Sequence, residues 1–220
     1  MKFTDRRAAG RQLAERLVPR NYPNPVVLAL PRGGVPVGLE IALALAAPLD
    51  LILVRKIGAP QQPELAIGAI ADGDEPELVT DPQLIRHLDV SPEYLADAQA
   101  TALREIERRR KAYFGDRQPA EIAGQTAIVV DDGIATGATM RAALHSVRRR
   151  KPARLVLAVP VAPGHTLAQL RHEVDEVVCL DTPQDFHAVG QFYLRFPQLR
   201  DEEVTALLAQ AHALKPSARN

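Results

Sequence analysis

Residues 127–139 have the sequence AIVVDDGIATGAT, which places an apolar run, two acids and a small-residue loop directly before a helical pattern. A short, wholly apolar run is typical of a strand buried in a parallel sheet. Gly133 and Gly137 allow the backbone to turn tightly and to approach a ligand closely. Because the first N–H groups of a helix lack partners, the helix that follows offers a site for an anion, most naturally a phosphate.

The polar side chains of this stretch divide into two kinds. Thr136 and Thr139 can add hydroxyl donors to the anion site. Asp131 and Asp132 lie too close to a bound phosphate to be its ligands, so they fit as acceptors for sugar hydroxyls or as indirect Mg²⁺ ligands. The stretch lacks both the GxxxxGK[ST] pattern and the GxGxxG pattern, which excludes two common nucleotide-binding loops.

Apolar runs alternate with helical patterns along the rest of the chain. The expected strands are Val26–Leu30, Asp50–Lys56, Ala66–Ala71, Thr126–Asp132, Arg154–Val161 and Asp175–Leu180. The expected helices are Thr4–Leu17, a segment ending near Ala46, Pro92–Phe114, Ala138–Arg150, Thr166–His172 and Asp201–Leu214. This rhythm predicts an α/β fold with a parallel sheet covered on both faces. Ligands of such sheets bind beyond the carboxyl ends of the strands.

The composition fits one globular domain. The chain has 220 residues, 46% of them hydrophobic and 25% charged, and its formal net charge is zero. These values exclude intrinsic disorder and fibrous structures, and they give no whole-chain attraction to nucleic acid or to an anionic membrane. We expect a cytoplasmic protein, because the N-terminus lacks an apolar signal core and no apolar run is long enough for a membrane span. The single cysteine, Cys179, lies in an apolar run, so we expect a buried, inert thiol.

A second strand end carries the sequence LALPRGG, Leu28 to Gly34. Gly33 and Gly34 expose backbone N–H groups, and the Arg32 guanidinium suits phosphate oxygens. Taken alone, the segment is equally typical of a glycine turn that starts a helix. Arg55 and Lys56 end another expected strand, and two cations there would point toward the same ligand edge, although a solvated strand end is the alternative.

The segment VVDDGIATGAT resembles the phosphate-loop signature of the type I phosphoribosyltransferases. This resemblance implies that Gly133 and the run Ala135, Thr136, Gly137, Ala138 and Thr139 bind the 5-phosphate of phosphoribosyl pyrophosphate (PRPP). It also implies that Arg32, Gly33, Gly34, Arg55 and Lys56 contact the pyrophosphate. Further segments, among them VRKIGAP and VGQFYLRF, are similar to bacterial proteins that carry only a provisional phosphoribosyltransferase name.

The resemblance implies a Mg²⁺-dependent reaction in which a nitrogen nucleophile replaces pyrophosphate at ribose C1. The catalytic residues would be Asp131, Asp132, Arg32 and Lys56. Positioning and electrostatic stabilisation of an oxocarbenium-like transition state would be their main tasks. The ion would arrive with PRPP, without direct protein ligands, and reach the two aspartates through water.

The acceptor end of the site is predicted less sharply. The resemblance implies one phosphoribosyltransferase domain over 1–220, with an insertion or cap at 72–118 and a small hood at 181–200. Asp185 and Phe186 are the candidates for holding a nucleobase, with Phe192 and Tyr193 as further aromatic candidates, and each aromatic also fits a plain core role. The Gly/Pro-rich segment IGAPQQPEL, which contains Glu64, is expected to form a mobile loop that closes over PRPP.

Two other functions stay open. The same fold could sense PRPP and regulate by binding RNA or DNA through a basic face. The basic segments are LREIERRRKAYF and RRRKPAR, and such segments are more typical of solvated helix faces. Hydrolysis of PRPP or a nucleotide by water is a weaker alternative. The main prediction has PRPP and a small acceptor as its partners, with no membrane and no nucleic acid, and the resemblance implies a homodimer.

Overall fold

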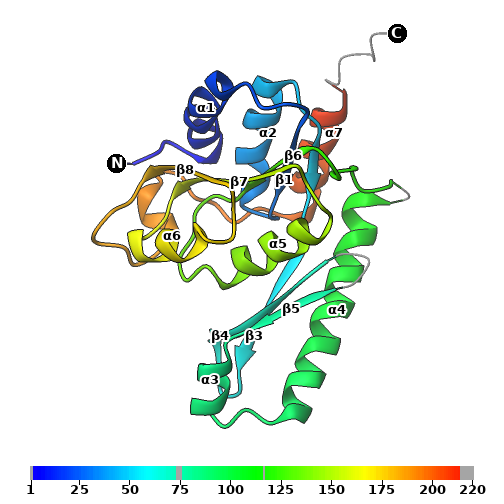
Figure 1. Cartoon of the computed structure of the whole chain (residues 1–220), viewed down its shortest axis with the longest axis vertical. Coiled ribbons are helices and arrows are strands. Elements are labelled where there is room, and N and C mark those ends of the chain that lie inside the picture. Colours follow the sequence, from blue (N-terminus) through cyan, green and yellow to red (C-terminus); the bar gives the residue numbers. More distant parts are fainter. Residues whose placement is uncertain (1, 73–75, 116, 214–220) are drawn as a thin grey trace.

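A computed structural model describes residues 2–72, 76–115 and 117–213 and is built around a parallel sheet (Figure 1). The sheet has five strands in the order β2-β1-β6-β7-β8, every neighbouring pair of which is parallel. The strands are β1 (Pro25–Ala29), β2 (Leu49–Leu51), β6 (Thr126–Val130), β7 (Arg154–Val161) and β8 (Glu176–Asp181). The predicted α/β fold with a parallel sheet is therefore confirmed.

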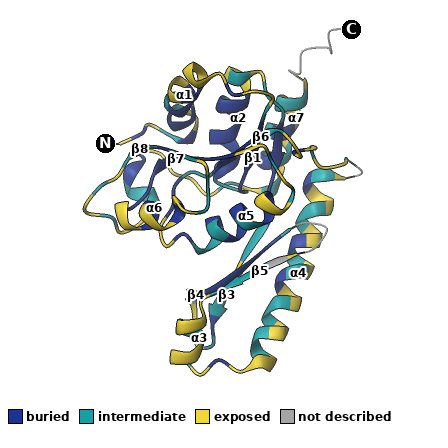
Figure 2. Ribbon diagram, viewed as in Figure 1, coloured by how far each residue is buried: buried dark blue, intermediate teal, exposed yellow. Residues whose placement is uncertain are grey.

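Helices cover both faces of this sheet, as the alternation of side chains along each strand requires. Val27 and Ala29 of β1 pack in the core on the side of α1, α2 and α7, whereas Val26 and Leu28 pack in the core on the side of α5 and α6. Strands β1, β2, β6 and β7 are almost wholly buried, whereas the edge strand β8 is mostly half-buried (Figure 2). The helices are α1 (Arg6–Leu17), α2 (Gly34–Leu45), α5 (Ala138–Arg149), α6 (Gly164–Leu170) and α7 (Asp201–Ala213), with short 3-10 turns at Val18–Arg20 and Val189–Phe192.

A second, three-stranded antiparallel sheet extends away from the parallel sheet together with two helices (Figure 1). We call this unit the arm. Its elements are β3 (Val54–Ala59), β4 (Gln62–Ala71), β5 (Glu77–Thr80), α3 (Pro82–His87) and α4 (Pro92–Phe114). One face of the arm sheet packs on α5 through Ala69, Ala71 and Ala142, and small side chains there let sheet and helix approach closely.

One buried carboxylate ties the arm back to the parallel sheet. Asp50 of β2 is 1% exposed, and it accepts hydrogen bonds from Arg117 Nη2 at 2.7 Å and from the backbone N–H of Ala120. Arg117 and Ala120 lie on the segment that leads from α4 to β6. The chain therefore leaves β2 for the arm and returns to a point held by that same strand.

The structure corrects the predicted strand Asp50–Lys56. β2 ends at Leu51, and β3 begins only at Val54, in the other sheet. The run is apolar from Leu51 to Val54, so nothing in its local pattern marks Ile52 and Leu53, at which the chain changes sheets.

The structure corrects the form of the predicted loop IGAPQQPEL, because these residues make an antiparallel hairpin, and its closure over PRPP stays a prediction. β3 and β4 pair from Val54 and Ala71 to Ala59 and Gln62, with irregular register around Gly58. The glycine and the prolines serve the tight turn and this irregularity. Glu64 lies within β4, and its side chain falls outside the described residues.

The longest helix follows its sequence signals closely. Ser91 caps the first turn of α4 through a hydrogen bond from the Tyr94 N–H, and Pro92 occupies the first helical position. Gly115 ends the helix with a positive φ of 55°. The predicted helix Pro92–Phe114 is thus confirmed to the residue. Among the described residues, no helix is both long enough and apolar enough to cross a bilayer.

Candidate active site

The two glycine-containing strand ends meet directly at the carboxyl edge of the parallel sheet. A Cβ atom added at Gly33 would lie 2.0 Å from Asp132 Oδ2, and one added at Gly34 would lie 2.7 Å from the Val130 carbonyl oxygen. The turn after β1 is therefore packed against the acidic pair after β6 with no room for a side chain. The peptide bond between Pro31 and Arg32 in this turn is cis.

The loop between β6 and α5 presents an open helix start. Gly137, at φ 83°, is the residue before α5, and Thr166 Oγ1 fixes the loop by donating to the Ala135 carbonyl at 2.9 Å. Ala135 and Thr136 are exposed, while Ala138 and Thr139 are half-buried in the first turn of the helix. Unpaired N–H groups and hydroxyls are thus available to an anion at this point. Gly133 is buried, and Val189 of the 3-10 turn Val189–Phe192 lies where its side chain would be.

Arg6 of α1 holds the second aspartate from the other side. Arg6 Nε donates to Asp132 Oδ2 at 2.7 Å, and the two side chains are only 10% and 13% exposed. The Arg6 guanidinium also donates to the Pro197 carbonyl at 2.8 Å and lies 3.7 Å from the centre of the Phe196 ring. The Tyr193 hydroxyl completes the contact by donating to the Asp132 carbonyl at 2.6 Å.

The sequence analysis missed the role of Arg6, although a signal for it exists. The buried face of α1 consists of Arg6, Ala9, Gly10, Leu13, Ala14 and Leu17. This is the spacing of a helix face that points into a core, so an arginine within it must have a buried partner. The partner itself lies 126 residues away along the chain, where no local pattern can indicate it.

The pKa values of the two aspartates are set by different neighbouring charges. Burial raises the pKa of Asp131 well above its usual range, and the neighbouring Asp132 carboxylate raises it further. Burial also raises the pKa of Asp132, but the Arg6 guanidinium opposes this effect. One guanidinium thus faces two buried carboxyl groups, and hydroxyl donors or a cation would favour their ionised forms.

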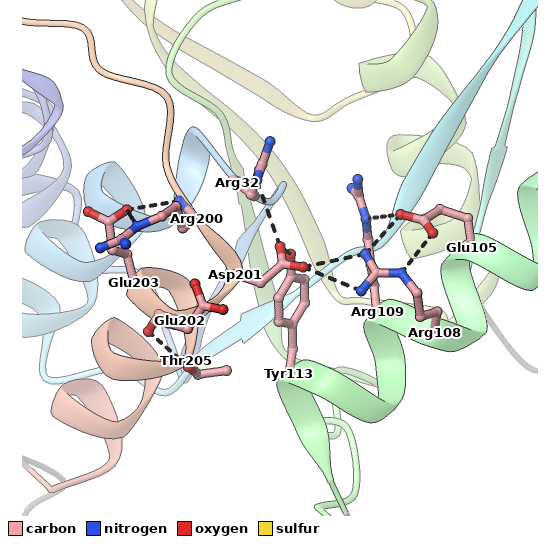
Figure 3. Close-up of polar contacts among 10 residues, drawn as sticks. All are labelled: Arg32, Glu105, Arg108, Arg109, Tyr113, Arg200, Asp201, Glu202, Glu203 and Thr205. Atoms are coloured by element: carbon pink, nitrogen blue, oxygen red, sulfur yellow. Dashed lines mark hydrogen bonds and ion pairs between the residues drawn. The ribbon is translucent and has the colours of Figure 1, made fainter.

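Arg32 extends from the turn toward α4 and α7 (Figure 3). Its Nη1 atom lies 3.9 Å from Asp201 Oδ1, and its side chain is 30% exposed. The side chain therefore stands between the strand-end motifs and the base of the arm.

The structure corrects the shared direction predicted for Arg55 and Lys56. Both lie in β3, where successive side chains point to opposite faces. Lys56 is exposed and pairs across the sheet with Ala69, whose face packs on α5. Arg55 is half-buried and pairs with Ile70, which belongs to the main core. Only one of the two cations can face a given ligand.

The hood candidates lie in a small aromatic cluster. The Phe186 ring stacks on Phe192 with centroids 5.3 Å apart, and Phe192 and Tyr193 are buried with Phe3. For Phe192 and Tyr193 the core role thus holds. Asp185 is exposed, and its carbonyl accepts from the Gln191 side chain at 2.8 Å.

Several remaining groups have contacts of their own. Burial raises the pKa of the half-buried Cys179 thiol to about 11, which agrees with the expected inert thiol. Arg108 and Arg109 pair with Glu105, and Arg148 pairs with Asp175, so parts of both basic segments carry local counter-charges. Within the described ranges, no three His, Cys, Asp or Glu side chains converge as a metal site.

The fold is α/β, and its glycine-containing and acidic strand ends meet at the carboxyl edge of the parallel sheet. A family model described as phosphoribosyl transferase domain matches residues 4–197. The chain therefore belongs to the phosphoribosyl transferase domain family.

Individual relatives agree with this assignment. In each of two strains of Mycobacterium tuberculosis, a protein with a provisional phosphoribosyl transferase name is 46% identical over 212 residues. The match covers 96% of this chain but 47% of the relative, so the chain spans about half the length of the curated relatives it matches. The crystal structure of a Thermus thermophilus protein is similar with a TM-score of 0.81 and 45% identity, covering 96% of this chain and 99% of that one.

Proposed function

We propose that this chain transfers the phosphoribosyl group of PRPP to a nitrogen atom of a small acceptor, of the nucleobase type, and releases pyrophosphate. The observation that carries the proposal is the packing of the Gly33–Gly34 turn against Asp131 and Asp132. This packing brings a cationic turn, two carboxylates and an open helix start to one edge of the sheet. PRPP has matching parts in its pyrophosphate, its sugar hydroxyls and its 5-phosphate.

The loop before α5 would bind the 5-phosphate. Its donors are the N–H groups from Ala135 to Thr139 together with the hydroxyls of Thr136 and Thr139, and Gly133 and Gly137 let the backbone reach the ligand. The support is the left-handed Gly137 and the exposure of Ala135 and Thr136. A dianionic phosphate at a helix start gains both hydrogen bonds and the favourable end of the helix dipole.

Asp131 and Asp132 would accept hydrogen bonds from the 2- and 3-hydroxyls of the ribose. Their raised pKa values support this role, because a buried pair with a single guanidinium is short of donors and of positive charge. The same shortage suits Mg²⁺, which prefers oxygen ligands and keeps several waters. Asp131 and Asp132 would hold the ion through water while pyrophosphate oxygens complete its shell. When bound, the ion would neutralise charge that builds up on the departing pyrophosphate.

The turn after β1 would bind the pyrophosphate through the N–H groups of Gly33 and Gly34 and through the Arg32 guanidinium. Lys56 is the favoured cation of the β3 pair, because its face of the arm sheet covers α5, the helix that starts at the phosphate loop. Arg55 would then act through the overall positive charge of β3. These groups stabilise the leaving group as positive charge develops on the sugar ring.

The acceptor would bind between this edge and the hood. Asp185 can accept an N–H of a heterocycle, and the face of Phe186 not covered by Phe192 can stack on a ring. We place the reaction in the cytoplasm and propose a homodimer as the working form.

The direct test is thermal unfolding with and without PRPP and Mg²⁺. A ligand at ~100 times its dissociation constant adds about 2.7 kcal/mol, which raises the midpoint by roughly 5–10 °C for a chain of this size. The double variant Asp131→Asn/Asp132→Asn should lose this rise and the release of pyrophosphate. The control Asp97→Asn/Glu107→Gln removes the same charge from the exposed surface of α4 and should keep both.

The outcomes separate the candidate functions. Pyrophosphate release that requires a nucleobase supports transfer, whereas release without an acceptor indicates hydrolysis. A PRPP-dependent rise without turnover, together with salt-dependent nucleic-acid binding, indicates the regulatory function. A folded aspartate double variant with unchanged PRPP kinetics would refute the site.

A further inference from the structure

Asp201, the first residue of α7, lies where three separate parts of the chain meet (Figure 3). The Tyr113 hydroxyl near the end of α4 donates to Asp201 Oδ1 at 2.5 Å. The Arg108 guanidinium, also on α4, lies 3.4 Å from Asp201 Oδ2. Arg32, from the turn after β1, reaches Asp201 Oδ1 at 3.9 Å. The Asp201 carboxylate, which belongs to α7, thus contacts both the arm and the turn assigned to pyrophosphate.

The contacts to α4 fix this carboxylate in its charged form. The hydrogen bond from Tyr113 is the largest cause that lowers the pKa of Asp201, and Arg108 lowers it further. Tyr113 is itself buried, and burial raises the pKa of its phenol to about 12, so it remains a donor at neutral pH. Asp201 therefore keeps its position and its charge whether or not Arg32 is near.

The contact to Arg32 is of a different kind. At 3.9 Å it is an ion pair without a direct hydrogen bond, and the Arg32 side chain is 30% exposed. A guanidinium is a planar fork with five N–H donors. One edge can therefore face Asp201 while the other edge faces a phosphate oxygen. Restricting a long, flexible side chain before the ligand arrives reduces the entropy lost on binding.

We infer that Asp201 is a positioning residue for Arg32, and that Tyr113 holds Asp201 in place from the arm. This inference rests on the proposed pyrophosphate role of Arg32. Asp201 does not touch the substrate; it limits the directions in which the Arg32 guanidinium can point. The arm thereby gains a physical connection to the pyrophosphate turn through α4.

The neighbouring acids of α7 provide a matched control. Glu203 is engaged by Arg200, to whose N–H it is bonded at 2.8 Å. Glu202 is exposed and lies next to Asp201 in the first turn of α7. Glu202→Gln removes one negative charge from the same helical turn as Asp201→Asn, so both variants change the helix dipole interaction equally.

The test is calorimetric binding of pyrophosphate with Mg²⁺, with ribose 5-phosphate as the comparison ligand because it lacks the pyrophosphate. Asp201→Asn should weaken pyrophosphate binding about threefold to fivefold, the range of a partly exposed charge pair. Binding of ribose 5-phosphate should stay unchanged. Tyr113→Phe should weaken pyrophosphate binding in the same direction by less, and Glu202→Gln should leave it unchanged.

A double-mutant cycle with Arg32→Ala separates positioning from simple charge repulsion. If Asp201 acts through Arg32, Asp201→Asn has no weakening effect once Arg32 is absent. If Asp201 only repels the ligand, its removal tightens pyrophosphate binding in both backgrounds, which overturns the inference. Equal loss of both ligands together with lower thermal stability would show a merely structural role and also overturns it.

Failure of the inference can be told from failure of the proposed function. If Arg32→Ala weakens pyrophosphate binding but Asp201→Asn does not, only the positioning role of Asp201 is wrong. If Arg32→Ala itself leaves pyrophosphate binding unchanged, the assignment of Arg32 is wrong, and the inference about Asp201 falls with it.

Discussion

Replacement of Gly33 by alanine tests the packing on which the whole site depends. The added Cβ would lie 2.0 Å from Asp132 Oδ2 and 2.5 Å from its Cγ. An ordinary contact begins near 3.4 Å, so the carboxylate must move by about 1.4 Å. Asp132 is short and is held by Arg6 Nε at 2.7 Å, and a movement of that size breaks this hydrogen bond.

The magnitude follows from two opposing effects. A buried hydrogen bond between charged groups contributes about 1.5–3 kcal/mol. Alanine restores about 0.4–1 kcal/mol by restricting the unfolded chain, because Gly33 has an ordinary φ of −63°. The net loss is about 1–2 kcal/mol, which lowers the unfolding midpoint by roughly 2–8 °C for a chain of this size.

The assay is calorimetric unfolding of Gly33→Ala beside Gly164→Ala, whose added Cβ would meet nothing within 4 Å. Gly164→Ala should be neutral or slightly more stable. Gly33→Ala should be less stable and should lose most of the PRPP-induced rise, because its Asp132 carboxylate is displaced. If the two variants have the same stability and the same response to PRPP, the close packing of the two motifs is not real.

Three further predictions concern the charges around the site. Asp131→Asn should raise the stability of the ligand-free protein at neutral pH. The pKa of Asp131 is raised above its unfolded value of 3.8, so the stability of the parent protein falls as pH rises from 3.8 to the folded pKa. Urea titrations at several pH values should therefore show that the stability gain of the variant shrinks toward pH 4. Arg6→Met should lower the free energy of unfolding by about 3–5 kcal/mol, because it leaves the buried Asp132 carboxylate unpaired. The control is Arg7→Met, whose arginine is 45% exposed, and both variants are compared by chemical denaturation. Equal losses of stability in the two variants would refute the buried pair. Cys179 should react with a disulfide reagent at pH 8 about tenfold more slowly than an unfolded-chain thiol. Its pKa of about 11 instead of 9.0 lowers the thiolate fraction about a hundredfold, and the higher nucleophilicity of that thiolate offsets part of the loss. Labelling of the native protein as fast as of the unfolded chain would contradict this.

Local signals in the sequence were sufficient for most of the fold. Helix α4 carries a serine cap, a proline at its first position and a terminal glycine, so both its ends could be predicted. β6 and β7 each contain a continuous apolar run, over 127–130 and 155–161. The arm sheet was missed because the choice between two sheets depends on tertiary packing, which the continuous apolar run 51–54 does not encode.

The candidate site shows the same division. Strand ends are followed by the glycines, the acidic pair and Arg32. Because the carboxyl ends of parallel strands meet at one edge of the sheet, the sequence predicts that these residues lie close together. Arg6, Tyr193 and Asp201 reach the site from the two ends of the chain, and their partners are defined only by the folded structure. For Arg6 the helical spacing of α1 was a usable signal, whereas no pattern in the sequence marks Asp201.

The hydrogen bonds that Asp50 accepts from Arg117 and Ala120 have a consequence for how the chain can change in length. Because Asp50 binds Arg117 and Ala120 as the arm returns, the two ends of the arm are closed at the parallel sheet. The closure entropy of a flexible turn at the tip of the arm rises by only about 0.6 kcal/mol for each doubling of its length. Insertions and deletions at the far tip, around the β3–β4 turn and α3, therefore leave the register of the parallel strands intact. The arm is the place where homologous chains can differ in size while their cores remain superimposable.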